Sequence, residues 1–327
     1  MKSYLGIDLG GTDIKVGVVR EDYTIAAKHS APTMHPRPAE EIVGDMVAAG
    51  KKALRTAGLS EADINCVGVS VPSMVGADNR IIFANNLNWV DYDLAPVFRS
   101  FWDIPVRIVN DADAAALAEV YAGAAREFDN VVMLTLGTGI GGSIIIDRKI
   151  YAGKDNCGTE PGHIIIAKDG EPCTCGARGC FETYASVNGL IRGTVRAMAQ
   201  YPGSIMHGMC GGDVSRIEGR TPFDAASKGD EAGQLAVDNY IGYLAAGIAS
   251  LIVAIRPQAV ILGGGVCNAG ESLFGPLRKA VKPLTSVLGT ASISLILKAE
   301  LGNDAGVIGA ALLTRSADRK SSVVSDQ

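Results

Sequence analysis

The sequence predicts an α/β protein made of two related halves with a cleft between them, and two observations support this fold class. A unit of strand, glycine turn and strand occurs at residues 4–19 and returns at 131–146, about 125 residues later. The chain has 327 residues, more than one hydrophobic core usually accommodates. It also contains 40 glycines, well above the average usage of about 7%, which indicates many tight turns or backbone that must approach a ligand closely.

Between the repeated units, elements alternate as expected for an α/β chain. We expect strands at 4–9 and 14–19, a helix at 39–57 with its apolar residues at helical spacing, a strand at 67–71 that ends before Pro72, and a strand at 106–109 that leads into an alanine-rich helix at 114–125. The second half is expected to contain strands at 131–136, 143–146 and 259–262, and a buried helix at 240–255 whose Gly242 and Gly247 allow close helix packing.

These elements suggest a domain division. We expect a small α/β domain at 1–118, completed by a C-terminal helix at about 304–316, and a large α/β domain at 119–303. The polar tail at 317–327 is expected to be disordered.

Composition excludes several classes of protein. With 47% hydrophobic and 20% charged residues, the chain is neither disordered nor an evident membrane protein. A net charge of −5 argues against nucleic-acid and anionic-membrane partners. The longest uncharged run, 240–255, is shorter than the roughly 20 residues that span a bilayer. Asp8 interrupts any secretory signal, and four of the seven cysteines lie at metal-like spacing, so we expect a cytoplasmic protein.

Three glycine turns are candidates for phosphate binding. They lie at 10–12, 137–142 and 263–265, each directly after a predicted strand. Residues 137–142 match G-x-G-x-x-G, but a strand follows the turn, whereas a dinucleotide-binding fingerprint requires a helix there. Consecutive backbone N–H groups in such turns bind phosphate oxygens. A single turn of this kind would more often be an ordinary hairpin that needs glycine for positive φ; two matched turns and a third favour phosphate binding.

Side chains beside these turns extend the prediction. Thr12 and Thr138 offer hydroxyl groups to a phosphate, and Lys15 offers a positive charge. Asp8, the last acid before the first turn, suits a hydrated Mg²⁺, although a lone aspartate at a strand end more often caps a turn.

Asn110 and Asp111 lie where a strand is expected to end and a helix to begin. Both residue types are good helix N-caps, and alone this interpretation is the stronger one for Asp111. The alternative is that Asp111 is a general base for phosphoryl transfer to a hydroxyl group. If Asp113 were the cap, Asp111 would be available for that chemistry.

His163, Cys173, Cys175 and Cys180 form an H-x9-C-x-C-x4-C pattern. Three cysteines and one histidine make a closed structural zinc site; the alternative is a coincidence of free thiols, which three cysteines within eight residues disfavours. Glu160 and Glu182 flank the pattern, and a metal would bring them close together. Carboxylates accept hydrogen bonds from several hydroxyls at once, as a sugar site requires; without the metal they would be ordinary surface glutamates.

Together, the motifs Asp8–Thr12, Leu136–Gly142, Glu160–His163 and Cys173–Glu182 resemble the ROK family (repressors, open reading frames, kinases) of the actin-like ATPase/hexokinase superfamily, from about residue 3 to 315. The resemblance implies two ribonuclease H-like domains with an interdomain active-site cleft that closes over ATP and a sugar. It implies that Asp111 is the catalytic base and that Asn110, Asp111, Glu160, His163 and Glu182 contact the sugar, so that His163 would serve both zinc and sugar. The nucleotide would be held by Asp8, Gly10, Gly11, Thr12, Lys15, Thr138, Gly139, Gly263, Gly264 and Gly265.

The sequence departs from the family pattern at Ser73, Asn85, Pro161 and Ser143. None of these changes removes a catalytic group, but Ser73 and Asn85 fall in a region that borders the sugar in relatives. We therefore expect a kinase that uses Mg²⁺-ATP and carries structural Zn²⁺, with glucose as the first candidate substrate and N-acetylmannosamine, fructose or allose as alternatives. Dimers are common among relatives, so a homodimer is expected.

Two alternative functions, other than that of a sugar kinase, remain open. A sugar-responsive transcriptional regulator shares this fold, but only seven residues precede Asp8 and the chain is acidic, which argues against DNA binding. The second alternative is an ATPase that acts on a partner protein. The group of Glu160, His163 and Glu182, which is suited to binding sugar hydroxyls, argues against this function.

Overall fold

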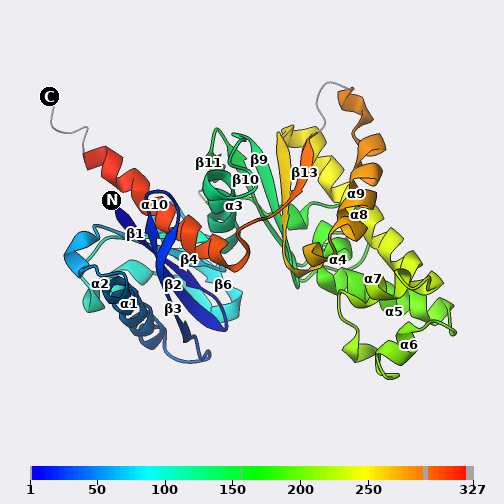
Figure 1. Ribbon diagram of the computed structural model, residues 1–327, viewed down its shortest axis with the longest axis horizontal. Coiled ribbons are helices and arrows are strands. Elements are labelled where there is room, and N and C mark those ends of the chain that lie inside the picture. The colour runs from blue at the N-terminus through cyan, green and yellow to red at the C-terminus, as the bar shows by residue number, and fades with distance from the viewer. Residues whose placement is uncertain (1, 156, 290–293, 322–327) are drawn as a thin grey trace. The chain divides into compact units, whose positions relative to one another are not determined.

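The chain forms two compact units in the computed structural model, which describes residues 2–155, 157–289 and 294–321 (Figure 1). Unit 1 comprises Met1–Glu127, Ile144–Thr159 and Glu300–Gln327, and unit 2 comprises Phe128–Ser143 and Glu160–Ala299. The predicted division differs from these units chiefly at 119–127 and 144–159, which belong to unit 1.

Two five-stranded mixed sheets have the same strand arrangement. The first has the order β3-β2-β1-β4-β8, from β1 (Ser3–Leu9), β2 (Asp13–Arg20), β3 (Ile25–Pro32), β4 (Val67–Val71) and β8 (Val106–Asn110). The second has the order β11-β10-β9-β12-β13, from β9 (Val131–Leu136), β10 (Ile140–Ile146), β11 (Lys149–Ile150), β12 (Ala259–Gly263) and β13 (Leu295–Lys298). In the first sheet β1 runs antiparallel to β2 and parallel to β4; in the second β9 runs parallel to β12. The predicted repeat of strand, glycine turn and strand is therefore confirmed.

Unit 1 also contains helices and a small sheet. The helices are α1 (Ala39–Thr56), α2 (Leu94–Phe101), α3 (Asp111–Ala122) and α10 (Ala305–Ser321). The predicted apolar face of α1 is buried, namely Ile42, Val43, Met46, Val47 and Leu54. An antiparallel sheet of β5 (Met74–Val75), β6 (Ile81–Ala84) and β7 (Trp89–Tyr92) was not expected from the sequence. Helix α10 includes 317–321, which the prediction assigned to a disordered tail; 322–327 lie outside the described residues.

Helix α10 packs directly on a row of glycines in the first sheet. Gly17, Gly6 and Gly68 are register partners on β2, β1 and β4. A Cβ atom at Gly68 would lie 1.8 Å from the carbonyl oxygen of Ala310, and one at Gly6 would lie 2.0 Å from that of Val307. Part of the glycine excess thus serves the contact between helix and sheet, since no other residue permits this approach.

Unit 2 is rich in helices, which are α4 (Phe181–Ala185), α5 (Val187–Gln200), α6 (Met206–Met209), α7 (Thr221–Ala226), α8 (Glu231–Ile255) and α9 (Glu271–Leu284). Helix α8 packs against α5, α7 and α9. Among the described residues it alone is long and apolar enough to cross a membrane, by length and composition only, and half of its most apolar window is buried. Gly247 touches the Phe181 ring, as close packing predicts, but Gly242 is exposed with no atom nearby, so the packing explanation is wrong for Gly242.

Candidate functional site

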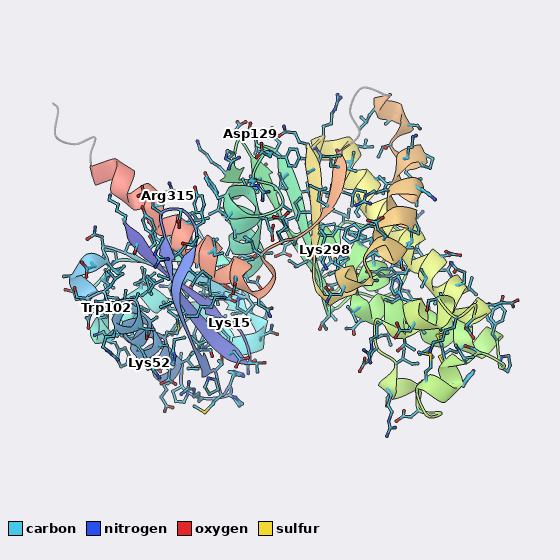
Figure 2. The ribbon with its side chains drawn as sticks, in the orientation of Figure 1. Lys15, Lys52, Trp102, Asp129, Lys298 and Arg315 are labelled. Carbon is cyan, nitrogen blue, oxygen red and sulfur yellow. The ribbon has the colours of Figure 1, made fainter. Side chains whose placement is uncertain are left out.

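Asp8 lies in a row of polar side chains across the first sheet. Its register partners are Lys15 on β2, labelled in Figure 2, and Ser70 on β4. Directly paired residues share one face of a sheet. The Ser70 hydroxyl donates a hydrogen bond of 2.6 Å to Asp8 Oδ1, and a Cβ atom at Gly306 would collide with the Asp8 carboxylate. The sheet and the start of α10 therefore fix this carboxylate close to the first glycine turn.

The first glycine turn, Gly10–Thr12, is held by hydrogen bonds to Asp13 and to the buried Thr33. The Gly10 N–H donates to the Asp13 carbonyl at 2.9 Å, and the Gly10 carbonyl accepts from the Thr33 hydroxyl at 2.7 Å. Thr33 N–H donates to the Thr12 carbonyl at 2.7 Å, while the Thr12 side chain is exposed. The turn is thus anchored by the Gly10 N–H and by the carbonyl groups of Gly10 and Thr12. Turns of this kind can present their remaining N–H groups to an anion.

Helix α3 begins three residues earlier than predicted because Asn110 caps it. Asn110 Oδ1 accepts from the N–H groups of Ala112 at 2.8 Å and Asp113 at 3.2 Å. Both sequence-based alternatives, a cap by Asp111 or by Asp113, are therefore wrong. Asp113 is buried, whereas Asp111, the first residue of α3, is exposed.

Asn110 also holds the segment that follows β4. Its Nδ2 donates to the Ser73 carbonyl at 2.9 Å. The Asn110 side chain therefore caps α3 with its oxygen and holds the segment after β4 with its nitrogen. Ser73 is 6% exposed, and among the described residues its hydroxyl has no hydrogen-bond partner. Ser73 is thus bonded directly to the residue before Asp111. The side chain of Asn85 lies outside what the structure describes.

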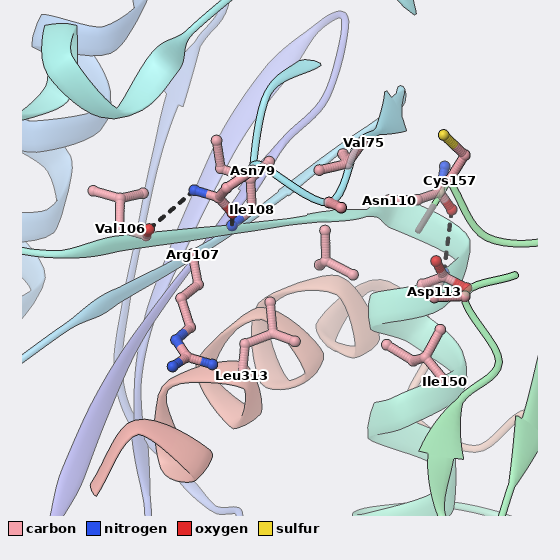
Figure 3. Close-up of a pocket in the computed structure, with 13 residues that line it drawn as sticks. Val75, Asn79, Val106, Arg107, Ile108, Asn110, Asp113, Ile150, Cys157 and Leu313 are labelled. Atoms are coloured by element: carbon pink, nitrogen blue, oxygen red, sulfur yellow. Dashed lines mark hydrogen bonds between the residues drawn. The ribbon is translucent and has the colours of Figure 1, made fainter. Parts of the chain in front are cut away.

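A cavity of about 530 Å³ follows the outer edge of β8 in unit 1 (Figure 3). The Asn79 amide covers part of that edge, donating to the Val106 carbonyl at 3.1 Å and accepting from the Ile108 N–H at 2.7 Å. Asn110 and Asp113 also line the cavity. Sequence analysis did not identify it, because residues from four separate segments form its wall.

In unit 2 the second glycine turn is covered by Glu182. The Ile140 N–H donates to Glu182 Oε2 at 2.9 Å, and a Cβ atom at Gly139 would lie 2.1 Å from the same oxygen. Glu160 is close enough to His163 and Glu182 for their charges to act on it. Partial burial of its carboxyl raises the pKa of Glu160, His163 opposes this rise, and Glu182 adds to it. The structure therefore brings the three predicted residues of this unit together.

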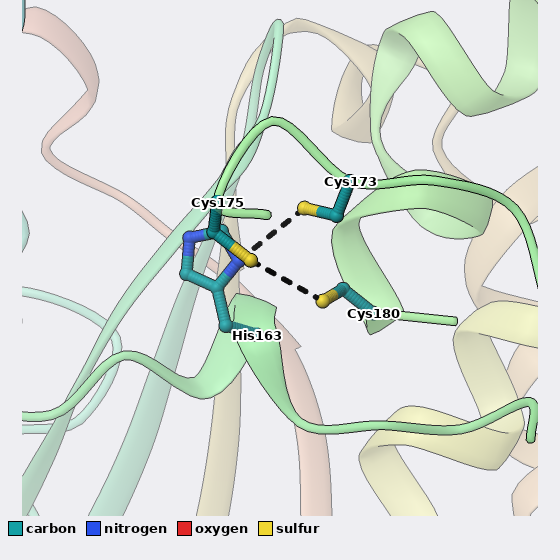
Figure 4. A group of neighbouring side chains, drawn as sticks. All are labelled: His163, Cys173, Cys175 and Cys180. Carbon is teal, nitrogen blue, oxygen red and sulfur yellow. Dashed lines mark hydrogen bonds between the residues drawn. The ribbon is translucent and has the colours of Figure 1, made fainter. Parts of the chain in front are cut away.

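The predicted metal ligands converge (Figure 4). One ligand atom from each of His163, Cys173, Cys175 and Cys180 lies within 4.8 Å of all the others. Zn–S bonds of about 2.3 Å and Zn–N bonds of about 2.0–2.1 Å place tetrahedral ligand atoms about 3.5–3.8 Å apart. Cys173 Sγ lies 3.6 Å from His163 Nδ1, and Cys175 Sγ lies 3.7 Å from Cys180 Sγ. The four residues thus fit zinc, with Nδ1 of His163 toward the sulfurs and its other ring nitrogen away from them.

The third glycine turn lies beside the second. Strand β12 pairs in parallel with β9, and a Cβ atom at Gly264, whose φ is 101°, would lie 2.1 Å from the Leu136 carbonyl. Gly265 lines a cavity of about 530 Å³ in unit 2, together with residues that sequence analysis missed: Glu218, Arg220, Phe223 and Asn268. They carry no motif and come from two segments about 45 residues apart, 218–223 and 265–268, so only the fold places them here.

The predicted residues are thus divided between the units. Asp8, Gly10, Gly11, Thr12, Lys15, Asn110 and Asp111 belong to unit 1, and Thr138, Gly139, Glu160, His163, Glu182, Gly263, Gly264 and Gly265 belong to unit 2. Both units are ribonuclease H-like, as in actin-like ATPases. The ROK family model matches residues 4–317. The chain belongs to the ROK family.

Similar proteins include kinases and a regulator. A glucokinase of Thermotoga maritima is 33% identical over 315 residues, covering 95% of this chain and 96% of the relative. The crystal structure of a ROK family glucokinase from Streptomyces griseus in complex with glucose and AMPPNP is 34% identical, with a TM-score of 0.79 over 96% of this chain and 99% of that chain. The xylose repressor of Bacillus subtilis is 28% identical, covering 93% of this chain and 75% of the relative.

Proposed function

We propose that this ROK protein is an ATP-dependent sugar kinase that phosphorylates a hexose hydroxyl, with glucose as the first candidate. The observation that carries this proposal is the full-length similarity to glucokinases, one of which has been crystallised with glucose and AMPPNP. The geometry of both units agrees with it. In unit 1, Asp8 lies near the end of β1 and Asp111 directly after β8, and both of these strands pair in parallel with β4. In unit 2, Glu182 contacts the second glycine turn and lies close to Glu160.

Nucleotide binding is assigned to the glycine turns. Thr138 and Gly139 would contact the phosphates, and the cavity bordered by Gly265 would take the adenosine. Phe223 offers an aromatic face to a base, and Asn268 offers an amide to hydrogen-bond it. Gly10, Gly11 and Thr12 would contact phosphates from unit 1, with Lys15 supplying a charge. Asp8 is suited to hold Mg²⁺, which when bound neutralises phosphate charge.

Sugar binding and proton removal are assigned to the remaining residues. Glu160, Glu182 and the second ring nitrogen of His163 would orient the sugar hydroxyls. His163 and the three cysteines would hold zinc, which when bound would fix the orientation of the imidazole ring. Asn110 is the N-cap of α3, and Asp111, the first residue of the helix, accepts the Ala112 N–H on Oδ1 at 2.9 Å. Asp111 would accept the proton of the sugar hydroxyl as the hydroxyl oxygen attacks the γ-phosphorus of ATP in line, while the bond from that phosphorus to the β–γ bridging oxygen breaks and ADP leaves.

The test is ADP release measured over a panel of glucose, fructose, allose and N-acetylmannosamine. Asp111→Asn should keep the fold and sugar binding but lower kcat by about 10²- to 10⁴-fold, the contribution of a general base. Asp22→Asn is the matched control, because Asp22 lies in the turn at the opposite end of β2 from the glycine turn. Near-normal turnover by Asp111→Asn would refute the assignment of the base.

A second candidate is a sugar-responsive regulator without kinase activity, which the likeness to the xylose repressor favours. The same panel separates the two candidates. A regulator would bind a sugar in calorimetry and release no ADP with any of them. ADP release that needs no sugar would instead indicate an ATPase that acts on a partner protein.

A further inference from the structure

The segment that follows the metal ligands holds both ends of the second glycine turn. Cys180 is the residue before α4, and Glu182 lies in the first turn of that helix. The Glu182 carboxylate accepts from Ile140 N–H at 2.9 Å, and the Val187 N–H donates to the Gly137 carbonyl at 2.9 Å. The turn between Gly137 and Ile140 is therefore attached to the chain at positions two and seven residues after a metal ligand.

The Glu182 carboxylate lies between the glycine turn and the metal ligands. Its Oε2 lies so close to the turn that a Cβ atom at Gly139 would be 2.1 Å away, and a larger residue there would displace the carboxylate. Its Oε1 lies 3.9 Å from Cys173 Sγ. A single side chain thus contacts both the backbone that would bind phosphate and a residue that would bind zinc.

We propose that Glu182 is a positioning residue of the phosphate turn, and that through the Glu182 carboxylate the metal site sets the affinity for nucleotide phosphates. This inference rests on the proposed function, because it takes 137–142 as a phosphate-binding turn. It differs from the sugar contact that the family resemblance implies for Glu182, because the hydrogen bond to Ile140 acts on the nucleotide side.

The physical reason is preorganisation of the turn. A backbone N–H group bonded to a carboxylate makes one of the stronger hydrogen bonds in proteins. With Ile140 held by Glu182 and Gly137 held by Val187, the turn has one shape before the nucleotide arrives. Without the carboxylate, phosphate binding must also order the turn, which weakens affinity.

The first experiment measures binding of AMPPNP and of adenosine by calorimetry. Glu182→Ala should weaken AMPPNP binding by about tenfold, in line with loss of a charge-assisted hydrogen bond, and leave adenosine within about twofold, since adenosine does not reach the turn. Glu182→Gln keeps an acceptor oxygen and should recover part of the AMPPNP affinity. Glu171→Ala is the matched control: Glu171 is also in the metal loop, but its carboxylate pairs with exposed Arg196, so both affinities should stay unchanged.

Each other outcome has a distinct meaning. Unchanged AMPPNP binding with weaker glucose binding would overturn the inference and leave Glu182 as a sugar contact. Equal weakening of AMPPNP and adenosine would overturn it as well, because the whole site would then be disturbed. If the unaltered protein does not bind AMPPNP, the proposed function fails and this inference fails with it.

The second experiment tests the link to the metal. Zinc content is measured by atomic absorption before and after chelation, and AMPPNP affinity is measured in both states. Removal of zinc should weaken AMPPNP binding severalfold in the unaltered protein and have little further effect in Glu182→Ala, because the connection is already broken. Equal weakening in both proteins would show that the metal acts by a route other than Glu182.

Discussion

Replacement of Gly68 by alanine should be among the most damaging single-methyl changes in this protein. Gly68 lies on β4, in the row of glycines on which α10 packs. The added Cβ atom would lie 1.8 Å from the Ala310 carbonyl oxygen and 2.5 Å from its carbonyl carbon. Both are backbone atoms inside a helix, so no side-chain rotation can remove the collision.

The size of the effect follows from the displacement required. Real Cβ atoms essentially never come closer than 3.0 Å to such a neighbour, so strand and helix must separate by at least about 1.2 Å, the difference between 3.0 and 1.8 Å. The contact surface of α10 includes Val307, Ile308, Ala310 and Ala311, all nearly fully buried. A shift of this size removes much of their dispersion energy. We expect a loss of about 3 kcal/mol in the free energy of unfolding, at the upper end for overpacked cores.

The assay is urea unfolding followed by tryptophan fluorescence. The chain has two tryptophans, Trp89 and Trp102, and both belong to unit 1, so the signal reports on the unit that contains Gly68. Gly242→Ala is the matched control, for which we expect a change of opposite sign in the free energy of unfolding; its unfolding is followed by circular dichroism. Gly242 lies inside α8 with nothing within 4 Å, and alanine should stabilise the helix by up to about 1 kcal/mol. A change of less than 0.5 kcal/mol for Gly68→Ala, roughly that of an ordinary surface substitution, would refute the reasoning.

Three further predictions concern buried or clustered polar groups. Ser73→Ala removes a buried hydroxyl that has no partner among the described residues, and should stabilise unit 1 by about 1 kcal/mol in urea unfolding. Glu119→Ala should cost about 3–5 kcal/mol in the same assay, because the nearly fully buried Glu119 carboxylate accepts from the N–H groups of Ala124, Glu300 and Leu301; Glu119→Gln should cost less. Cys175→Ser should abolish stoichiometric zinc in atomic absorption, since it removes one of four ligands from a closed site; full retention of zinc would contradict that geometry.

The sequence predicts the central strands well and the edges poorly. The predicted bounds of strands 67–71 and 131–136 are the observed ones. The first has valine at every second position and the second is almost entirely apolar, and both sequences are typical of buried strands. Edge strand β3, with the mixed sequence IAAKHSAP, and the short strands of the small sheet have no such signal. Their pairing depends on neighbours far along the chain, which local pattern cannot supply.

Some residues of the candidate site could be predicted from the sequence and others could not. The metal ligands could be predicted because they lie within 18 residues, and spacing alone limits what such a cluster can be. The residues that line the unit 2 cavity could not be predicted, because Arg220 and Phe223 are brought next to Gly265 only by the packing of α8 and β12. The close approach of Gly68 to α10 is equally invisible in sequence, since the glycine and its partner are 242 residues apart.

The segment from Asn110 to Asp113 shows why residue type alone could not assign a role. Asn110, Asp111 and Asp113 are all competent helix caps, and the sequence favours the two aspartates over the asparagine that caps the helix. The decision comes from β8, which ends at Asn110 and leaves that residue in an extended conformation, with ψ of 148°, directly before the first helical residue. An amide suits this position better than a carboxylate, because its Nδ2 also donates to the Ser73 carbonyl, which a carboxylate would repel. Capping by asparagine therefore leaves Asp111 exposed and Asp113 buried, and a sequence with three similar side chains yields three different environments.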